Sequence, residues 1–258
     1  MDKTPRYTAP ALEKGLDIIE LLARTRVPMT MTEIGARLGR SKNEIFRNLR
    51  ILEERGYLER RDGGDRFRLT NRLFEMGMSN PPVANLIEAA YPVMAETART
   101  ISQSIHLAVA SRDQMVVVAR AESPGEVGFT VPIGHRRILS EASSGRVLLA
   151  FQHPPIQDQW IELVRAALGE AELDEAALRA RLAEIRDQGC EVADSATVLG
   201  VKDIGFPIFA PGGEAMAAIT APFVHRRSGR DDLQVGIAAL RLAAHRINMA
   251  LAAPRRSI

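Results

Sequence analysis

The sequence has almost none of the residues that crosslink a chain or hold a metal cluster. It contains a single cysteine, Cys190, among 258 residues. One cysteine excludes an internal disulfide and a cysteine-rich metal site, and it suits a reducing compartment. The five histidines are scattered without a paired metal-ligand spacing. We therefore expect no metal and no disulfide.

Phosphate-binding loops and catalytic pairs are equally scarce. The stretches "PGEVG", "PGG" and "SSGR" hold turn glycines but lack the spacing of a phosphate loop, so no cofactor is expected. Cys190 and His106 are the one candidate pair of nucleophile and base, and nothing in the sequence brings them together. A solitary cysteine is usually a small core residue. We expect neither catalytic residues nor enzyme activity.

Long hydrophobic runs are also missing. No stretch of about 18 apolar residues is free of charge, so no membrane-spanning helix is expected. The opening stretch "MDKTPRYTAPALEKG" lacks the apolar centre of a secretory signal. An apolar share of 46% and a charged share of 26% are ordinary for a globular protein. These features predict a cytoplasmic protein that is long enough for two modest domains or one large one and has no membrane partner.

Charge is spread unevenly along the chain. Residues 1–80 contain 16 Lys and Arg against 12 Asp and Glu, which gives a net charge of +4. Residues 81–258 contain 18 against 20, which gives −2. A basic N-terminal part favours a polyanionic partner. So small an excess is common in proteins that bind no nucleic acid, so charge alone does not decide the function.

Two short helices separated by "GR" are predicted near the N-terminus. "TMTEIGARLG" begins with Thr30, has Glu33 three residues later and ends at Gly39, which is the spacing of a capped helix. Ser41 and Glu44 repeat that spacing immediately. Two helices joined so closely meet at a steep angle, as in a helix-turn-helix.

The second helix of this pair carries side chains suited to DNA. Ile45, Leu49 and Leu52 lie at i, i+4 and i+7 and are expected to face the core. In a helix-turn-helix the N-terminal part of the second helix meets the base edges. Arg and Asn have the bidentate geometry for guanine and adenine. The side chains of this helix predicted to contact DNA are Ser41, Lys42, Asn43, Arg47 and Asn48.

A basic hairpin follows the helix pair. In "YLERRDGGDRFRL" the glycines suit a tight turn, and apolar residues alternate with arginines in "RFRL". Arg61 and Arg66 are predicted to reach phosphates or a minor groove. Met76 and Met78 are expected to close the core beneath. Helix, turn, helix and hairpin together predict a winged helix-turn-helix, and the alternative is a winged helix used only for protein contacts.

Two amphipathic stripes are candidates for both core and assembly. The helix predicted over "ALEKGLDIIELLART" places four apolar residues on one face: Leu12, Leu16, Ile19 and Leu22. A second helix, from residue 83 to about 101, is expected to bury Leu86, Ala90, Val93, Met94 and Ala98. Leu12, Leu16, Leu86 and Val93 are candidates for a self-complementary interface. The sequence does not divide them between interface and core.

The second half of the chain alternates strands and helices. Strands are expected in "SIHLAVASRDQMVVVARAE", in "VGFTVPIG" and in the hairpin "IGFPIFAPGGEAMAAITAPFV". Helices are expected in "SSGRVLLAF", "PIQDQWIELVRAALG", "DEAALRARLAEIRDQG" and "LQVGIAALRLAAHRINMALAA". The order predicts an α/β domain with a pocket on its sheet. The prolines of "SNPPVANL" mark a boundary, so the expected domains are 1–80 and 102–258, joined by a linker helix over 81–101.

Over almost its full length the chain resembles the IclR family of bacterial transcription regulators. The N-terminal motifs that carry the resemblance are "ALEKGLDIIELL", "MTEIGARLGRSKNEIFRNLRILEERGYLER" and "FRLTNRLFEMG". The C-terminal motifs are "VGFTVPIGHRRILSEASSGRVLLAF", "RLAEIRDQGCEVADSATVLGVKDIGFPIF" and "AMAAITAP". The resemblance implies a mixed α+β and α/β chain with a winged helix-turn-helix, a linker helix and a GAF-like effector-binding domain. It also implies that the protein is a dimer or tetramer. Its function would be that of a repressor whose binding to double-stranded operator DNA is controlled by a small metabolite.

The resemblance also implies an effector pocket. Its polar groups are the backbone N–H groups of Ser143 and Ser144 and the positions of Asp203 and Thr220. Its walls are lined by Phe129, Arg137 and Val201.

Several positions depart from the family pattern. "SEASSGR" has Ser140, Ala142 and Arg146 where the family often has His, Thr and Lys. Asp203 stands where a cysteine is frequent, and an acidic stretch is reduced to "ADSA" with Asp194. The pocket is expected to be retained with an altered ligand chemistry.

The ligand chemistry follows from the charges expected in the pocket. A helix that begins at "SSGR" aims its first N–H groups at the pocket, which favours a carboxylate, and Arg137 would reinforce that preference. Asp203 opposes an anion unless it is paired or protonated. We expect an effector with an acidic end near Ser143 and Ser144 and a hydroxyl or amine near Asp203. Two alternatives stay open: Asp203 and Arg137 face water instead, or the chain is a small-molecule-binding interaction module without DNA binding.

Overall fold

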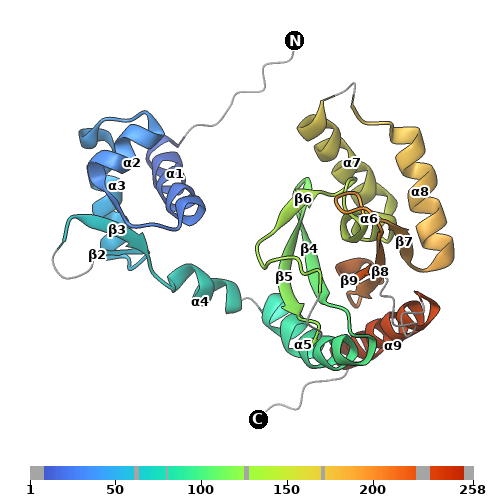
Figure 1. Cartoon of the computed structure of the whole chain (residues 1–258). Helices are drawn as coiled ribbons and strands as arrows, with labels where there is room; N and C mark the ends of the chain where they lie inside the picture. The colour runs from blue at the N-terminus through green and yellow to red at the C-terminus, as the bar shows by residue number, and fades with distance from the viewer. Residues whose placement is uncertain are drawn as a thin grey trace. The chain divides into compact units, whose positions relative to one another are not determined.

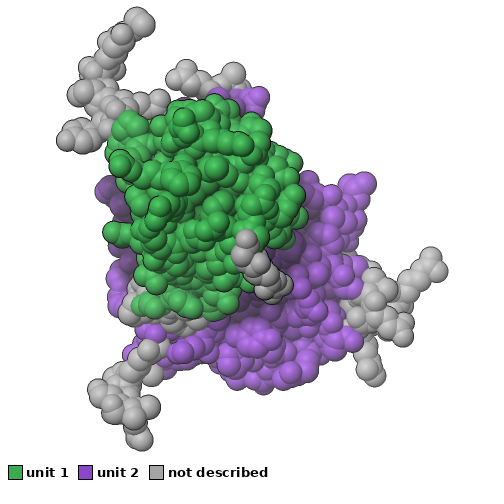
Figure 2. Space-filling view, turned by 90° about the vertical axis from the view of Figure 1, so that its left-hand side faces the viewer, with its two compact units in different colours: residues 1–84 green, residues 85–258 purple. Residues whose placement is uncertain are grey.

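The computed structural model describes residues 9–60, 64–79, 81–124, 128–169, 172–224 and 233–252, without the side chains of residues 78 and 81–84. The chain divides into two compact units, Met1–Ala84 and Asn85–Ile258, coloured green and purple in Figure 2. In the ranges described, no helix is both long and apolar enough to cross a membrane.

The first unit is a small helical domain with a three-stranded sheet (Figure 1). Its elements are α1 (Pro10–Thr25), β1 (Met29–Thr30), α2 (Met31–Leu38), α3 (Lys42–Glu54), β2 (Leu58–Arg60), β3 (Arg66–Leu69) and α4 (Arg72–Met78). The strand order is β1-β3-β2, and both pairs are antiparallel. Buried residues of the helices and of the hairpin form one core. The predicted winged helix-turn-helix is therefore confirmed.

The turn between α2 and α3 shows why the two helices meet steeply. Thr30 and Glu33 form the reciprocal cap predicted for α2, with N···O distances of 2.8 and 3.2 Å. Gly39 ends α2 with φ of +62°, a left-handed conformation that glycine adopts without strain. Gly35 lets the chain turn closely, because a Cβ there would lie 2.7 Å from the carbonyl oxygen of Arg40.

The apolar face expected on α1 is divided between core and surface. Leu22 is buried and Ile19 is half-buried against the core, whereas Leu12 and Leu16 are 63% and 48% exposed, because α1 turns Ile18 and Leu21 inward. One expectation for this unit is wrong. Met76 is 53% exposed and accepts a hydrogen bond from the Tyr57 hydroxyl at 3.4 Å, so it does not close the core. The side chain of Met78 lies outside the described residues.

The second unit is one antiparallel sheet covered by helices on both faces (Figure 1). Its elements are α5 (Pro81–Ile101), β4 (Ile105–Ser111), β5 (Gln114–Ala121), β6 (Arg136–Ile138), α6 (Ser143–Ala150), α7 (Pro154–Leu168), α8 (Glu175–Gln188), β7 (Glu191–Asp194), β8 (Val201–Phe209), β9 (Ala215–Val224) and α9 (Leu233–Ala252). The strand order is β6-β5-β4-β9-β8-β7, which places β4 and β9 at the centre.

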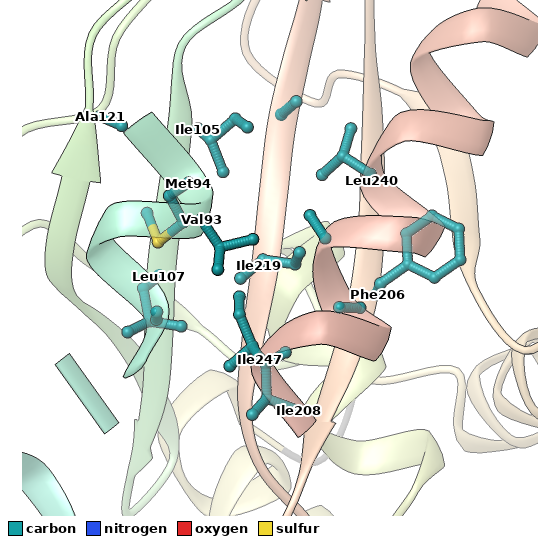
Figure 3. Packing of buried hydrophobic residues seen from close by; sticks show 14 of the residues in the cluster. Val93, Met94, Ile105, Leu107, Ala121, Phe206, Ile208, Ile219, Leu240 and Ile247 are labelled. Atoms are coloured by element: carbon teal, nitrogen blue, oxygen red, sulfur yellow. The ribbon is translucent and has the colours of Figure 1, made fainter. Parts of the chain in front are cut away.

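One face of this sheet packs against α5 and α9. Figure 3 shows Val93 and Met94 of α5, and Leu240 and Ile247 of α9, directed towards strand residues such as Ile219. The five residues predicted to be buried on α5 are all buried: Leu86, Ala90, Val93, Met94 and Ala98. Since α5 packs here, its residues from Asn85 onward belong to the second unit, whereas the helix over 81–101 was expected to link domains 1–80 and 102–258.

The opposite face packs against α6, which is covered in turn by α7 and α8, and these helices and the strands share the second core cluster of this unit. Because side chains alternate along a strand, Leu107 of β4 points to the first face, whereas its neighbour Ala108 packs with α6. The stretch "VGFTVPIG" is not a strand where the structure describes it, from residue 128 on, and that expectation is wrong. Gly134, with φ of +83°, turns the chain beside β5, and the short strand β6 begins only at Arg136.

Candidate functional site

The N-terminal half of α3 presents an exposed polar face. Lys42, Asn43 and Arg47 are exposed and Asn48 is half-buried. The core side of the helix is the predicted one, with Ile45, Leu49 and Leu52 buried. Lys42 and Arg47 form no ion pair with any residue that the structure describes. Their charges are thus available to a polyanion.

Glu44 organises the start of this helix. Its carboxylate accepts hydrogen bonds from the N–H of Ser41 at 2.9 Å and from the hydroxyl of Ser41 at 2.8 Å. These bonds, together with Lys14, lower the pKa of Glu44 to about 2. The Asn48 amide donates to the carbonyl oxygen of Glu44 at 3.2 Å. Of the predicted DNA contacts, Ser41 and Asn48 are therefore held by the helix itself.

The arginines of the hairpin are engaged with acidic side chains. Arg66 donates to both carboxylate oxygens of Glu33, at 3.0 and 3.2 Å, and to the carbonyl oxygen of Pro28 at 3.0 Å. Arg60 forms a similar two-point pair with Glu53, at 2.7 and 3.0 Å. Arg66 thus ties β3 to the start of α2, a role that the sequence pattern did not reveal. Arg61, the other predicted hairpin contact, lies outside the described residues.

The second unit contains a cavity of about 250 Å³ between the start of α6 and the sheet. Six of the seven predicted effector-binding side chains line it: Phe129, Arg137, Ser143, Ser144, Asp203 and Thr220. They come from a loop, from β6, α6, β8 and β9. Val201, the seventh, is not among the lining residues, because it is buried at the start of β8 opposite Val224.

The N-terminus of α6 faces this cavity. Ser143 and Ser144 are its first two residues, and both are buried. Ala142 precedes them and has no side chain that can cap the helix. Gly145 sets the position of the helix, because a Cβ there would lie 2.3 Å from the carbonyl oxygen of Leu139. The first N–H groups of α6 are therefore fixed beside the cavity without a side-chain cap, which suits an anionic group.

Asp203 is joined to the far side of α6 by a chain of polar contacts. The Ser143 hydroxyl donates to the Asp203 carboxylate at 3.2 Å and accepts from Arg146 at 3.2 Å. Arg146 also donates to the fully buried Glu191 at 2.6 and 2.8 Å. Burial raises the pKa of Asp203, although the Ser143 hydrogen bond and the charge of Arg146 oppose the rise. Asp203 is thus a partly buried group of the cavity wall and not a solvated strand end.

Several lining residues were not predicted from the sequence. They are His106, Met115, Thr130, Val131, Pro132, His135, Ala142, Ser195, Thr197, Val198 and Pro222. His106 is the most informative, because it is a buried titratable group on a central strand. No alternation marks it in the sequence, because the four residues that follow it are all apolar. Only the structure shows that it shares a strand face with Ala108.

The described part of the chain offers neither a cluster of metal ligands nor an activated nucleophile. No group of three or more His, Cys, Asp or Glu residues there is arranged to hold a metal ion. Cys190 packs in the core beneath α5 and α9, while His106 lines the cavity on the other face of the sheet. Burial raises the pKa of the Cys190 thiol, which disfavours the nucleophilic thiolate.

Comparison with known proteins identifies relatives of both units. The model of the C-terminal domain of bacterial IclR transcriptional regulators matches residues 82–249, and the model of the IclR helix-turn-helix domain matches residues 11–62. The regulator KdgR of Escherichia coli K12 is 27% identical over 250 residues, which cover 96% of this chain and 94% of KdgR. The repressor AllR of Salmonella typhimurium is 22% identical and covers 85% of this chain and 81% of its own.

Solved structures share the fold. An IclR homologue from Microbacterium hydrocarbonoxydans, crystallised with 4-hydroxybenzoate, superposes with a TM-score of 0.77 at 23% identity. The match covers 93% of this chain and 98% of that protein. At 23% identity this similarity shows a shared fold and no more.

Proposed function

Because the chain belongs to the IclR family of bacterial transcriptional regulators, we propose that it is a repressor released from or held on its operator by a small organic acid. The observation that carries the proposal is the cavity of the second unit, where six side chains expected around an effector converge. The relative AllR, which is named a repressor, supports the direction of control.

In this proposal α3 reads the operator. Lys42, Asn43 and Arg47 occupy the major groove or its edge, because they are exposed on the N-terminal half of the second helix of a helix-turn-helix. Ser41 and Asn48 hold the helix start and contact DNA through their remaining hydrogen-bonding capacity. Arg66 and Arg61 contact the phosphates of the DNA backbone. The guanidinium of Arg66 then binds Glu33 and a phosphate at the same time.

The effector lies with its carboxylate at the start of α6. The N–H groups there, which no side chain caps, and Arg137 in the cavity wall supply the positive potential that an anion needs. Arg137 lies 3.7 Å from Glu141, a weak pair that an incoming carboxylate can replace. Asp203, with its raised pKa, takes a hydroxyl or an amine of the effector, and Phe129 covers an apolar part.

The experiment that tests this function is an electrophoretic shift of DNA from upstream of the protein's own gene, with and without a panel of small organic acids. Retarded DNA whose retardation changes with one acid supports the proposal. Binding of an acid without any DNA binding would favour the alternative, a ligand-binding module for protein contacts. Retarded DNA that no acid affects would contradict the effector part.

A further inference from the structure

Phe46 of α3 is a large apolar side chain that stays outside the core. It is 51% exposed, whereas Ile45, Leu49 and Leu52 of the same helix are buried in the core of the first unit. Among the residues described, no aromatic ring and no cation stacks on the Phe46 ring. Single exposed apolar residues are common. The position of Phe46 on the helix therefore decides what its ring contacts.

Phe46 lies in the N-terminal half of α3, between two unpaired positive charges. Lys42 precedes it by one helical turn and Arg47 follows it directly; both are exposed, and neither forms an ion pair with a residue that the structure describes. Glu44 lies two residues before Phe46, nearly on the opposite side of the helix, and its carboxylate is bonded to Ser41. The helix thus presents one apolar ring flanked by two charges that suit phosphates.

The ring also borders a hollow of about 660 Å³ between α3, the start of α2 and the hairpin. Its C-terminal end on α3 is electrically balanced, because Glu53 there is paired with Arg60 at 2.7 Å. The end beside Phe46 and Lys42 is the one with an unpaired cation. Since the proposed function places both α3 and the hairpin on DNA, the hollow lies on the DNA side of this unit.

An aromatic ring on a reading helix recognises a base through an apolar group. In the major groove thymine alone presents a methyl group, on C5, and phenylalanine is one of the side chains that contact it. Guanine, adenine and cytosine are read through hydrogen bonds, which a phenyl ring cannot supply. Contact with the methyl group also removes exposed apolar surface of Phe46 from water, which is favourable.

We propose that Phe46 reads thymine: its ring contacts the C5-methyl group of a thymine in each half of the operator, and Lys42 contacts a phosphate beside that thymine. Phe46 is then a specificity-determining residue for DNA. The inference rests on the proposed function, since it assumes that α3 enters the major groove of an operator.

The test replaces thymidine by deoxyuridine, which lacks only the methyl group. The DNA from upstream of the protein's own gene is prepared in both forms, and the full-length chain is titrated against each by electrophoretic shift at fixed salt. The wild-type chain is expected to bind the deoxyuridine form about fourfold more weakly for each methyl group in contact, which is the effect of one such group removed from water.

Variants connect the methyl preference to Phe46. Phe46→Ala is expected to bind both DNA forms equally, and Phe46→Leu, which keeps an apolar side chain, is expected to retain part of the preference. Ile51→Ala is the matched control, because Ile51 is 44% exposed on the same helix but lies in its C-terminal half. This control should show the full preference. Each protein is compared with itself on the two DNA forms, so effects of deoxyuridine on DNA shape cancel between proteins.

The salt dependence distinguishes the apolar contact from the phosphate contact. Lys42→Ala is expected to weaken binding to both DNA forms alike and to lower the slope of log affinity against log salt concentration by about one unit. Phe46→Ala is expected to leave this slope unchanged, because it removes no charge. Its melting temperature should stay close to that of the wild type, since the ring lies outside the core.

The outcomes separate the two proposals. Wild-type binding that is equal on the two DNA forms would overturn this inference and leave the proposed function standing. A full preference for thymidine in both Phe46→Ala and Phe46→Leu would also overturn it, because another residue would then contact the methyl group. If none of the upstream DNA were retarded, the proposed function would fail first and this inference with it.

Discussion

At the scale of single residues, the second unit depends on polar groups buried beside its cavity. Glu191 is 0% exposed and lies between Arg146 and Arg181, at 2.6 and 3.5 Å. Arg146 continues the chain of contacts to Ser143 and so to Asp203. A buried carboxylate of this kind costs much to desolvate and is retained only with its partners in place. Its removal should therefore be felt in stability and at the cavity.

The first prediction concerns Glu191. Glu191→Ala is expected to lower the free energy of unfolding by roughly 3 kcal/mol, the lower end for a broken buried ion pair, because the partly buried guanidinium groups of Arg146 and Arg181 lose their buried counter-charge. Urea unfolding of the full chain measures the change. The matched control is Glu184→Ala, which removes an exposed partner of the same Arg181 and should cost only about 0–1 kcal/mol. Equal losses in both variants would contradict the role given to Glu191.

The second prediction concerns the pH dependence that His106 causes. Its pKa is lowered from 6.5 to about 4 in the folded chain. As the pH falls from 6.5 towards 4, the unfolded chain binds a proton that the buried imidazole does not bind, so the folded state loses stability. The loss approaches about 3 kcal/mol near pH 4. His106→Leu should lose less stability over the same interval.

Comparing the wild-type chain with His106→Leu isolates the contribution of His106 to the pH dependence of stability. Burial raises the pKa of Asp203, so its protonation acts in the opposite sense, but Asp203 and His135 are present in both proteins. Urea unfolding at several pH values between 7 and 4 measures both stabilities. Parallel stability curves for wild type and variant would show that His106 is not held neutral by the fold.

At the scale of elements, the start of α6 is the feature that shapes the cavity. Its approach to the preceding loop depends on the missing side chain at Gly145, where a Cβ would lie 2.3 Å from Leu139 O and 2.7 Å from Leu139 Cα. Those atoms are backbone and cannot move aside independently. The helix that presents Ser143 and Ser144 is therefore placed by a single glycine.

The third prediction follows from this contact. Gly145→Ala is expected to destabilise the chain by more than about 2 kcal/mol, the range of overpacked cores, and to abolish binding of the acid. The control is Gly15→Ala on α1, where a Cβ meets nothing within 4 Å. That change is expected to raise stability by roughly 0.5–1 kcal/mol, since alanine is the better helix former. Thermal and urea unfolding of both variants measure the two changes in stability. A Gly145→Ala protein as stable as wild type would contradict the role given to this glycine.

The fourth prediction concerns α3 as the element that reads DNA. Arg47→Ala is expected to weaken operator binding by about 1–3 kcal/mol and to relax the sequence preference, if Arg47 pairs with a base edge. Arg24→Ala removes the same charge from an exposed position on α1 and serves as the control. Binding is measured by electrophoretic shift at fixed salt. An Arg47→Ala protein that binds like the control would place the reading residues elsewhere.

At the scale of the whole molecule, one chain offers one reading helix. A single helix covers only a few base pairs, so a specific operator calls for two copies related by a two-fold axis. Of the four apolar residues predicted as interface candidates, Leu86 and Val93 are buried in the second unit's own core. Leu12 and Leu16 remain exposed on α1 and are the residues available for a second copy.

The fifth prediction is that these leucines hold an assembly together. The wild-type chain is expected to sediment as a dimer or tetramer at micromolar concentration, and Leu12→Ser with Leu16→Ser is expected to shift it towards the monomer. The fold should survive, because neither side chain fills the core. Leu199→Ser, at a fully exposed position of the second unit, is the control. A wild-type chain that sediments as a monomer would reject the assembly.

Local sequence patterns were sufficient for most of the elements. The reciprocal cap of Thr30 and Glu33 and the buried stripe of α3 are encoded within a few residues, so spacing alone predicts them. The strand expected over "VGFTVPIG", residues 127–134, was predicted wrongly from residue 128 on, because its β-branched residues were given more weight than Pro132 and Gly134. The family pattern led to six of the residues around the cavity.

What the sequence by itself determined is therefore the set of elements, their order and the chemistry they carry. Only the tertiary structure decided which side of α1 enters the core, because that depends on where α2 and α3 lie. It also decided that Arg66 pairs with Glu33, 33 residues away, and that His106 and Thr220 are register partners on the adjacent strands β4 and β9. The spacing of apolar residues predicts only which side chains share a face of one helix or strand. Contacts between distant elements are set by how the whole core packs.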